Sequence, residues 1–378
     1  MKIAIVHEWL TVMGGAELVV QMLHELFPSA PIYVLAHNPA KMPDHFRTMD
    51  IRTSFIQKLP FAKTKYRAYL PLFPIAVEQY DLSEYDLVIS SSHCCAHGVI
   101  TRSDAVHVCY CYTPVRYAWD LYHSYMKSLG RLSRLAAAPL LTFIRQWDYT
   151  SAQRVDKFVA ISNVVRERIR KHYGRNSQVL YPPVDTQRFR PVPRAEIGDY
   201  FFIMSRFVPY KRVDLAVQAF NKLNLPLYVA GEGPLAARLR KMAGPSVTFL
   251  GRISDEDAGN LMARCKAFIM PQEEDFGLTA VEAHAAGRPV IAYGRGGALD
   301  TVADGTTGAF FHEQSPEALA ETVASFKADE YDPEAMCRSA ARFTLAQFKN
   351  RFRRLVLGIS EERRWPAAGP APSQTSER

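Results

Sequence analysis

A chain of 378 residues, 48% of them hydrophobic and 22% charged, is long enough for two domains and too apolar to be mainly disordered. Its formal net charge of +8 would suit a nucleic acid, an anionic membrane surface or a phosphate-bearing ligand, and does not choose among them. Six cysteines without a Cys-x-x-Cys pair argue against a disulfide scaffold and a zinc knuckle.

The basic excess is confined to one stretch of the chain. Residues 101–180 hold 13 basic and 5 acidic side chains, a net of +8, whereas residues 1–100 have a net of −1 and residues 181–378 a net of +1. Between residues 127 and 171 the basic side chains alternate with apolar ones such as Leu132, Leu135 and Phe143. This pattern predicts either a surface that rests on anionic lipid or core-packing helices with a solvated basic face.

Short apolar runs alternate with amphipathic stretches from the N-terminus onward. In the first half, the pattern predicts strands at residues 2–7, 32–36, 87–90, 106–110 and 158–161, with helices at 16–26 and 163–173. The N-terminal residues lack the apolar core of a signal peptide, so we expect a cytoplasmic protein, at most peripheral on the inner face of the cytoplasmic membrane.

The alternation stops at Pro182-Pro183, which predicts a linker between domains or, alternatively, an ordinary turn within one domain, and then resumes. The second half predicts strands at 201–205, 227–230, 247–250, 268–270 and 290–292, helices at 212–223, 255–265 and 278–286, and one long helix at 333–357. Strands separated by helices form parallel sheets, so we expect an α/β protein with two doubly wound, Rossmann-like domains facing each other across a cleft.

Three segments near predicted strand ends could carry chemistry. Gly14-Gly15 follows the first strand and opens a helix, where a phosphate could approach the backbone. Arg206 and Lys211 follow the first strand of the second half, where two fixed cations could neutralise a diphosphate leaving group or, alternatively, belong to a solvated surface.

The third segment begins a helix with two carboxylates eight positions apart. Glu274 precedes the helix and Glu282 lies within it, while the backbone amides of Phe276, Gly277 and Leu278 are free to bind phosphate. Carboxylates accept hydrogen bonds from sugar hydroxyls, so this arrangement suits a polyol joined to a phosphate. Acidic residues around a helix start are also common as capping partners, and the combination with Arg206 and Lys211 favours the ligand.

Together, these motifs resemble those of family-four glycosyltransferases, which are retaining sugar-nucleotide enzymes of the GT-B fold, and in particular bacterial mannosyltransferases of polysaccharide assembly. The resemblance extends over about residues 1–357. It is carried by Gly14-Gly15, the 181–185 linker, Arg206 with Lys211, Gly231-Glu232-Gly233-Pro234, Glu274 with Glu282, the 282–291 segment and Gly294-Arg295-Gly296-Gly297.

The resemblance implies a domain plan. Residues 1–180 would form an N-terminal, acceptor-side Rossmann-like domain, and residues 181–340 a C-terminal domain that binds the nucleotide-sugar donor. Residues 341–362 would be a helix that crosses back to the N-terminal domain. Residues 363–378, rich in proline and without periodicity, are predicted to be a disordered tail.

The resemblance also implies residue roles. Arg206 and Lys211 would hold the donor diphosphate, Glu274 would contact the donor sugar and Glu282 the nucleotide ribose. The amides of residues 276–278 would bind sugar and phosphate, and Gly14 and Gly15 would approach the diphosphate from the other domain.

Contacts with the acceptor or the donor sugar are assigned to His93, Tyr112 and Arg116. Similar sequences often have histidine where this chain has Tyr112, which keeps a hydroxyl but cannot act as a base near neutral pH. His93 or His97 could make this contact with the donor sugar instead. The alternative for each is a structural histidine.

The resemblance therefore implies transfer of a hexosyl group, mannosyl from GDP-mannose, to a lipid-linked or oligosaccharide acceptor. The anomeric configuration would be retained, with a nucleoside diphosphate sugar as co-substrate and no cofactor or metal. A UDP-sugar donor such as UDP-glucose, or a non-catalytic sugar-nucleotide-binding partner, are the alternatives. A nucleic-acid-binding protein would explain the pI of 9.1 but not the two spaced glutamates, so we expect no nucleic-acid partner.

Overall fold

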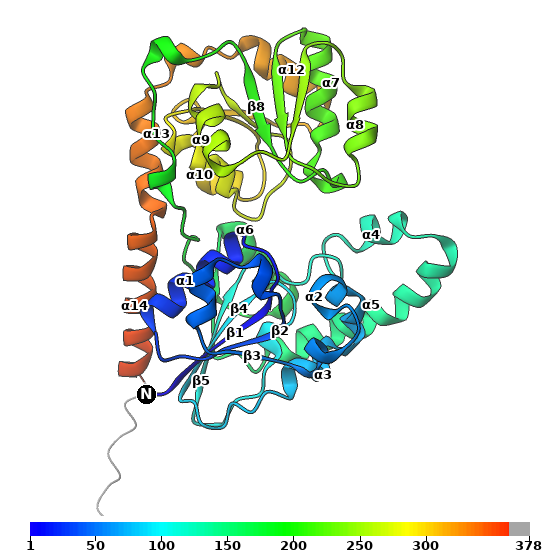
Figure 1. Ribbon diagram of the computed structural model, residues 1–378, viewed down its shortest axis with the longest axis vertical. Coiled ribbons are helices and arrows are strands. Elements are labelled where there is room, and N and C mark those ends of the chain that lie inside the picture. The colour runs from blue at the N-terminus through cyan, green and yellow to red at the C-terminus, as the bar shows by residue number, and fades with distance from the viewer. Residues whose placement is uncertain (363–378) are drawn as a thin grey trace, which may run out of the picture.

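The computed structural model describes residues 1–362 and contains two parallel sheets with helices packed against them (Figure 1). The first sheet has seven strands in the order β3-β2-β1-β4-β5-β6-β7, and the second has six in the order β10-β9-β8-β11-β12-β13. Every strand pairing within them is parallel, which confirms the predicted fold of two Rossmann-like units.

The strands are short, and those inside each sheet are mostly buried. Their bounds are β1 Ile3–Leu10, β2 Ile32–His37, β3 Ile51–Thr53, β4 Leu87–Ser92, β5 Val106–Cys111, β6 Lys157–Ala160 and β7 Ser177–Val179 in the first sheet, and β8 Phe201–Met204, β9 Leu227–Ala230, β10 Val247–Gly251, β11 Phe268–Met270, β12 Val290–Tyr293 and β13 Gly308–Phe311 in the second. Strands β3, β7 and β13 lie at sheet edges and were absent from the sequence-based prediction. Two of the three residues in β3 and in β7 are polar, and β13 begins with a glycine, so none of them shows the apolar run of a buried strand.

The helices connect successive strands. Their bounds are α1 Gly15–Leu26, α2 Ala62–Lys65, α3 Phe73–Glu78, α4 Tyr122–Ser128, α5 Arg131–Ala152, α6 Asn163–Tyr173, α7 Val213–Leu223, α8 Ala236–Met242, α9 Asp255–Arg264, α10 Leu278–Ala285, α11 Ala298–Thr301, α12 Pro316–Ser325, α13 Pro333–Ala340 and α14 Leu345–Glu362. Helix α6 begins where the sequence predicts it, and the Ser162 hydroxyl caps it by accepting a hydrogen bond of 3.2 Å from the Val165 amide.

The prediction of one continuous helix over residues 333–357 was wrong. The chain leaves the helical conformation at Thr344, whose extended backbone separates α13 from α14. The break is fixed from outside, since the Val184 amide donates a hydrogen bond of 2.8 Å to the Phe343 carbonyl. Periodicity alone could not reveal it, because both helices keep the same apolar spacing.

Helix α14 packs against the first sheet's helical layer beside α1 (Figure 1). The rings of Phe348 and Phe352 lie with their centroids 5.6 and 6.3 Å from that of Tyr110 in β5. Lys349 pairs with Glu25 of α1 at 2.9 Å. Helix α14, at the end of the described chain, therefore completes the core of the first sheet.

Helices α4 and α5 extend away from the first sheet as a hairpin (Figure 1). Among residues 1–362, no helix combines the length and the apolar character needed to cross a bilayer. The predicted tail at residues 363–378 lies outside the described residues.

Candidate functional site

A cavity of about 680 Å³ lies where the loops after β1, β8 and β11 meet. Because these loops follow the carboxyl ends of parallel strands, both sheets contribute to one space. Its lining includes Gly14 from the first half and Arg206, Lys211, Glu274 and Thr279 from the second. The structure thus brings together the glycines, the two cations and the first of the spaced carboxylates.

Lys211 and Glu274 contact each other inside this cavity. The Lys211 ammonium group forms an ion pair with Oε1 of Glu274, and the Gln272 amide donates to the same oxygen at 2.6 Å. Both ionic side chains are less than a fifth exposed. An anion entering the cavity therefore meets a lysine that is already oriented by a carboxylate.

Arg206 is more open to solvent than Lys211. Its guanidinium donates to the Tyr210 hydroxyl at 3.2 Å, the only side-chain hydrogen bond that it makes with the described residues. The Lys211 ammonium lies 5.4 Å from the centre of the Tyr210 ring. Tyr210 therefore positions both cations, and most of the Arg206 guanidinium remains available to a ligand.

The N-terminus of α10 opens toward the same region. Gly277 has φ of +94°, a left-handed conformation that glycine adopts without strain, and the helix begins at the next residue. Within the described chain, the amides of Gly277, Leu278 and Thr279 have no backbone acceptor. By contrast, the Phe276 side chain is buried and stacks on Tyr181, so its backbone is the part that can reach a ligand.

Gly15 lies directly against Leu278 across the two halves. A Cβ added at Gly15 would lie 2.5 Å from Cδ1 of Leu278, closer than any two carbon atoms can approach without rearrangement. The start of α1 and the start of α10 are therefore in contact, and both helix N-termini bring exposed N–H groups to the cleft.

Glu282 lies one turn into α10, beyond the residues that line the cavity. Burial raises the pKa of its carboxyl to about 7, a shift that the nearby Arg188 cation opposes and the Asp255 carboxylate reinforces. Burial disfavours the charged form when no donor neutralises it, and no described residue donates a side-chain hydrogen bond to Glu282.

Sequence reasoning missed a buried carboxylate in β1. Glu8 is fully buried, and its Oε1 accepts hydrogen bonds from the Ser92 hydroxyl and from the backbone amides of residues 93–96 at 2.9–3.2 Å. Burial alone would raise the pKa of Glu8, but His93 and His7 together with these donors hold it well below the usual range. A glutamate in the middle of an apolar strand was the signal that could have found it.

His93 is held by this carboxylate beside the glycine loop. Its Nδ1 lies 3.1 Å from Oε2 of Glu8, and its ring meets the Trp9 ring edge-on at 4.9 Å. The side chain is 30% exposed, so one edge of the imidazole is open to solvent. His97, by contrast, is buried against Asp148 and Ser151, which fits the structural reading.

The Tyr112 hydroxyl is hydrogen-bonded to residues of the first half rather than open to solvent. It hydrogen-bonds with the Ser91 hydroxyl at 2.8 Å and donates to the Ala16 carbonyl at 3.2 Å. Burial raises the pKa of Tyr112 far above its usual value, so the phenol stays neutral. Its contact is with the first turn of α1, near the glycines, and it anchors that helix.

Arg116 faces the other side of the cleft. Its guanidinium pairs with Asp275 at 3.3 Å and lies over the Tyr210 ring at 5.5 Å. It lines a second cavity of about 420 Å³, next to the first, together with Tyr210, Arg212 and Gln314. Because Tyr210 borders both cavities, they are two parts of one cleft.

The basic stretch 127–171 does not form one continuous surface. Arg131 and Arg134 are exposed on α5 beside Leu132 and Leu135, which are 83% and 75% exposed. Arg168 is only 9% exposed and faces the loop before α10, so it cannot touch a membrane. Other basic side chains of α6 are exposed, but within the described stretch exposed large apolar side chains accompany basic ones only on α4 and α5. The α4–α5 hairpin is therefore the candidate membrane surface.

Within residues 1–362, no group of three or more His, Cys, Asp or Glu side chains has the arrangement of a metal site. The chain does contain an Asp-x-Asp spacing at Asp255 and Asp257, in the first turn of α9. There, Asp257 accepts a hydrogen bond from the Ser254 hydroxyl at 2.6 Å and Asp255 pairs with Arg188 at 2.7 Å. Both carboxylates thus have roles at the helix start.

Two sheets facing a shared cleft, with loops from both sides lining it, define the GT-B fold. The same arrangement occurs in the Anabaena protein HepE in complex with UDP, with a TM-score of 0.70 at 16% identity over 95% of this chain and 100% of that one. Sucrose-phosphate synthase from Thermosynechococcus elongatus gives a TM-score of 0.70 at 19% identity over 96% and 100%.

Two family models match the chain in succession. "Glycosyltransferase Family 4" matches residues 13–188 and "Glycosyl transferases group 1" matches residues 185–343. The chain therefore belongs to the family-four glycosyltransferases of GT-B fold. The two matched segments meet at the predicted linker.

Several of the curated relatives are mannosyltransferases by name, and others are named only as glycosyltransferases. The GDP-mannose-dependent alpha-(1-6)-phosphatidylinositol monomannoside mannosyltransferase of Mycobacterium tuberculosis is 31% identical over 224 residues, which cover 51% of this chain and 58% of that protein. O-antigen chain mannosyltransferase C of Escherichia coli is 33% identical over 106 residues, covering 26% and 29%. The matches thus span about half the length of the first of these relatives and less of the second.

Proposed function

We propose that the chain transfers a mannosyl group from GDP-mannose to a lipid-linked or oligosaccharide acceptor in surface polysaccharide biosynthesis. The observation that carries the proposal is the cavity of about 680 Å³ in which Arg206, Lys211 and Glu274 surround one space beside Gly14. Two cations suit a diphosphate and a carboxylate suits sugar hydroxyls, so the lining matches the two halves of a sugar nucleotide.

In this mechanism, the bond between the anomeric carbon and the diphosphate oxygen breaks while the acceptor oxygen bonds to the same face of the sugar. The acceptor proton passes to the departing phosphate, and the configuration is retained. Arg206, Lys211 and the amides at the start of α10 stabilise the charge that develops on the diphosphate, without a metal. Glu274 orients the sugar, and its present partner Lys211 turns to the phosphate as the donor binds.

Contacts of the donor with the first half come from the glycine loop and His93. The Gly14 backbone lines the cavity, and the exposed edge of His93 can meet a sugar hydroxyl while Glu8 fixes the ring. Glu282 takes the ribose, which supplies the hydroxyl donors that this buried carboxyl lacks.

The donor base is the point on which relatives and structural neighbours differ. The curated relatives above include a GDP-mannose-dependent enzyme, whereas solved GT-B neighbours contain UDP or UDP-glucose. A UDP-sugar transferase is therefore the second candidate, and a non-catalytic sugar-nucleotide-binding partner is the third.

A donor screen tests the proposal. The full chain is titrated with GDP-mannose, UDP-glucose and UDP-galactose, and both binding heat and release of nucleoside diphosphate are measured. Tightest binding and turnover with GDP-mannose support it, whereas preference for a UDP-sugar moves the assignment to the second candidate. Binding that is unaffected by Glu274→Ala, or binding without any turnover, contradicts the catalytic role.

We also propose that the α4–α5 hairpin rests on the anionic inner face of the cytoplasmic membrane, where a lipid-linked acceptor would be found. Exposed Leu132 and Leu135 beside Arg131 and Arg134 support this, because apolar insertion and attraction to anionic headgroups reinforce each other.

A further inference from the structure

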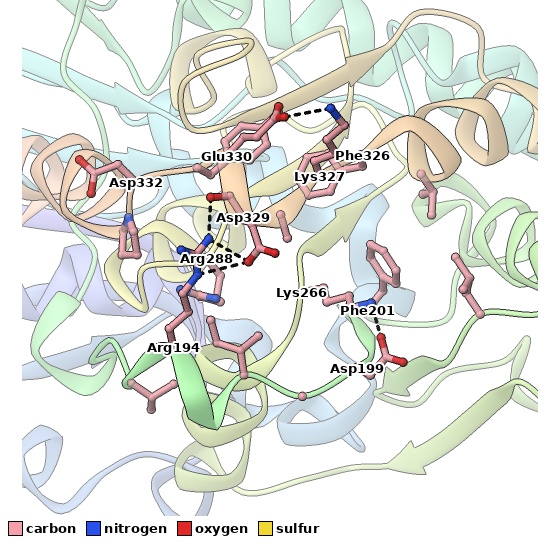
Figure 2. Close-up of a pocket in the computed structure, with 18 of the residues that line it drawn as sticks. Arg194, Asp199, Phe201, Lys266, Arg288, Phe326, Lys327, Asp329, Glu330 and Asp332 are labelled. Carbon is pink, nitrogen blue, oxygen red and sulfur yellow. Dashed lines mark hydrogen bonds and ion pairs between the residues drawn. The ribbon is translucent and has the colours of Figure 1, made fainter.

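A second large cavity, of about 950 Å³, lies in the C-terminal half, away from the residues of the donor site (Figure 2). Phe201 is the first residue of β8, Lys266 lies two residues before β11, and Arg288 two residues before β12. These positions mark the amino ends of the strands, whereas the donor site lies at their carboxyl ends. The two cavities are therefore at opposite edges of the same sheet.

Most charged side chains in this cavity have a partner of opposite sign. Figure 2 shows three such pairs at its wall. They join Arg194 to Asp329 at 2.9 Å, Lys327 to Glu330 at 3.0 Å, and Lys266 to Asp199. Asp332 caps α13 and pairs with Arg338 at 3.2 Å.

Arg288 is the exception. Its side chain lines the cavity, the residue is only 4% exposed, and within residues 1–362 its guanidinium makes no hydrogen bond or ion pair. Burial lowers the pKa of Arg288. Cys265 and Cys337 oppose this shift, and the Arg194 cation adds a smaller effect in the same direction as burial. Burying a cation without a counter-ion costs free energy. The Arg288 guanidinium therefore leaves an uncompensated positive charge at the wall of the cavity.

The backbone holds Arg288 in place. Gly287 has φ of +68°, and a Cβ there would lie 3.1–3.2 Å from Pro191 and Pro333, which enclose it from two sides. The Arg288 amide donates to the Ala283 carbonyl at 2.8 Å, so the residue is fixed to the end of α10. The guanidinium is thus presented by a rigid segment rather than by a mobile loop.

The rest of the cavity wall offers apolar surface, from Val192, Ile197, Phe201, Leu225, Val323 and Phe326. We propose that this cavity binds a small carboxylate with an apolar body, in which the carboxylate pairs with Arg288 and the body packs on these side chains. Two N–H groups of a guanidinium can donate in parallel to the two oxygens of a carboxylate. A ligand with one negative charge would neutralise the one unpaired cation. Such a site is separate from glycosyl transfer and does not depend on it.

The test uses the full chain and simple probes. Titration calorimetry with hexanoate, hexanamide and inorganic phosphate separates the charge from the apolar body. We expect hexanoate to bind at least tenfold more tightly than hexanamide or phosphate. Equal binding of hexanamide, tighter binding of phosphate, or no heat with hexanoate up to about 10 mM overturns the proposal.

Variants locate the site. Arg288→Met is expected to weaken hexanoate binding at least tenfold, whereas Arg190→Met, an exposed arginine outside this cavity, leaves it unchanged. Unchanged hexanoate binding in Arg288→Met overturns the assignment. Should Arg288→Met not fold, Arg288→Lys serves in its place. The ¹⁵N resonance of the wild-type Arg288 Nε must then shift with hexanoate but not with hexanamide, and a resonance that stays fixed is equally decisive against the site.

Discussion

Arg168 of α6 forms an ion pair with Asp275, 107 positions later, in the loop that leads into α10. The same guanidinium also pairs with Asp120 at 2.8 Å and with Glu273 at 3.2 Å. Burial alone would lower the pKa of Arg168, but these carboxylates raise it above its usual value. One side chain of the N-terminal half thus holds the loop that carries Glu274.

Replacing Arg168 should therefore destabilise the protein strongly. Arg168→Met leaves three carboxylates without their shared cation, and we expect a loss of about 3 kcal/mol in the free energy of unfolding. The matched control is Arg170→Met, because Arg170 is 73% exposed and, among residues 1–362, pairs only with Glu167 on the same helix, which predicts a loss of about 0.5 kcal/mol or less. Urea denaturation measures both, and equal losses would contradict the role given to Arg168.

The Lys211–Glu274 pair provides a test of catalysis. Lys211→Gln should lower kcat/KM with the preferred donor by about 10²–10³, because the departing diphosphate loses a fixed cation. Lys222→Gln breaks a comparable but exposed pair with Glu317 and should leave kcat/KM unchanged. Steady-state release of nucleoside diphosphate is the measurement. A similar effect of both variants would remove the special role of Lys211.

The contact between Gly15 and Leu278 predicts a steric effect on donor binding. Gly15→Val inserts a side chain where a single Cβ already lies 2.5 Å from Cδ1 of Leu278, so either the Leu278 side chain moves or the two helix starts separate. We expect about a tenfold weaker affinity for the donor, or about 1.4 kcal/mol, measured by calorimetry. Gly130→Val is the control, since nothing lies within 4 Å of a Cβ there. An unchanged affinity in Gly15→Val would show that the cleft accommodates the larger side chain, against this prediction.

Glu282 predicts a pH dependence of stability. Its pKa is about 7 in the folded chain and 4.5 as the unperturbed value, so the folded state binds more protons between these pH values, and stability falls as pH rises from 4.5 to 7. Glu282→Gln removes this titration. Relative to the wild type, the variant should gain on the order of 2–3 kcal/mol between pH 4.5 and pH 8. Urea denaturation at both pH values checks this, and a constant difference between the two proteins would disprove the shifted titration.

The α4–α5 hairpin predicts salt-sensitive membrane binding. The full chain should co-sediment with vesicles that contain anionic lipid, and the bound fraction should fall as salt rises. Leu132→Ser combined with Leu135→Ser should reduce binding severalfold, because two exposed apolar side chains are lost. Leu299→Ser, at a 61% exposed leucine in the other half, should not change it. Equal binding to neutral and anionic vesicles would count against this surface.

Much of the fold could be predicted from the sequence where apolar runs were long or clearly bounded. The strand at 268–270 and the helix start at Leu278 were placed at the observed residues, because Pro271 marks the end of the strand and Gly277 the start of the helix. The two-sheet architecture followed from the alternation of such segments. The break at Thr344 could not be foreseen, since it depends on a hydrogen bond from Val184, 159 positions before Phe343.

For the site, the sequence could indicate which residues lie at strand ends but not which of them meet. Gly14, Arg206, Lys211 and Glu274 do line one cavity, and their roles in catalysis stay predictions. The fixed ring of His93 and the committed hydroxyl of Tyr112 depend on contacts between distant strands, which no local spacing reveals. Glu8 was hidden because a buried carboxylate within β1 resembles an interruption of an apolar run.

Helix α14 has a consequence for the order in which the chain can fold. Phe348 and Phe352, which cover Tyr110 of the first sheet, are synthesised more than two hundred residues after it. A ribosome-bound chain that ends before residue 345 therefore exposes an apolar face on its first sheet until α14 has been synthesised. The first sheet is synthesised before the second, but its core is completed only when α14 packs on it. A chain that terminates before α14 leaves this apolar face uncovered and prone to aggregation.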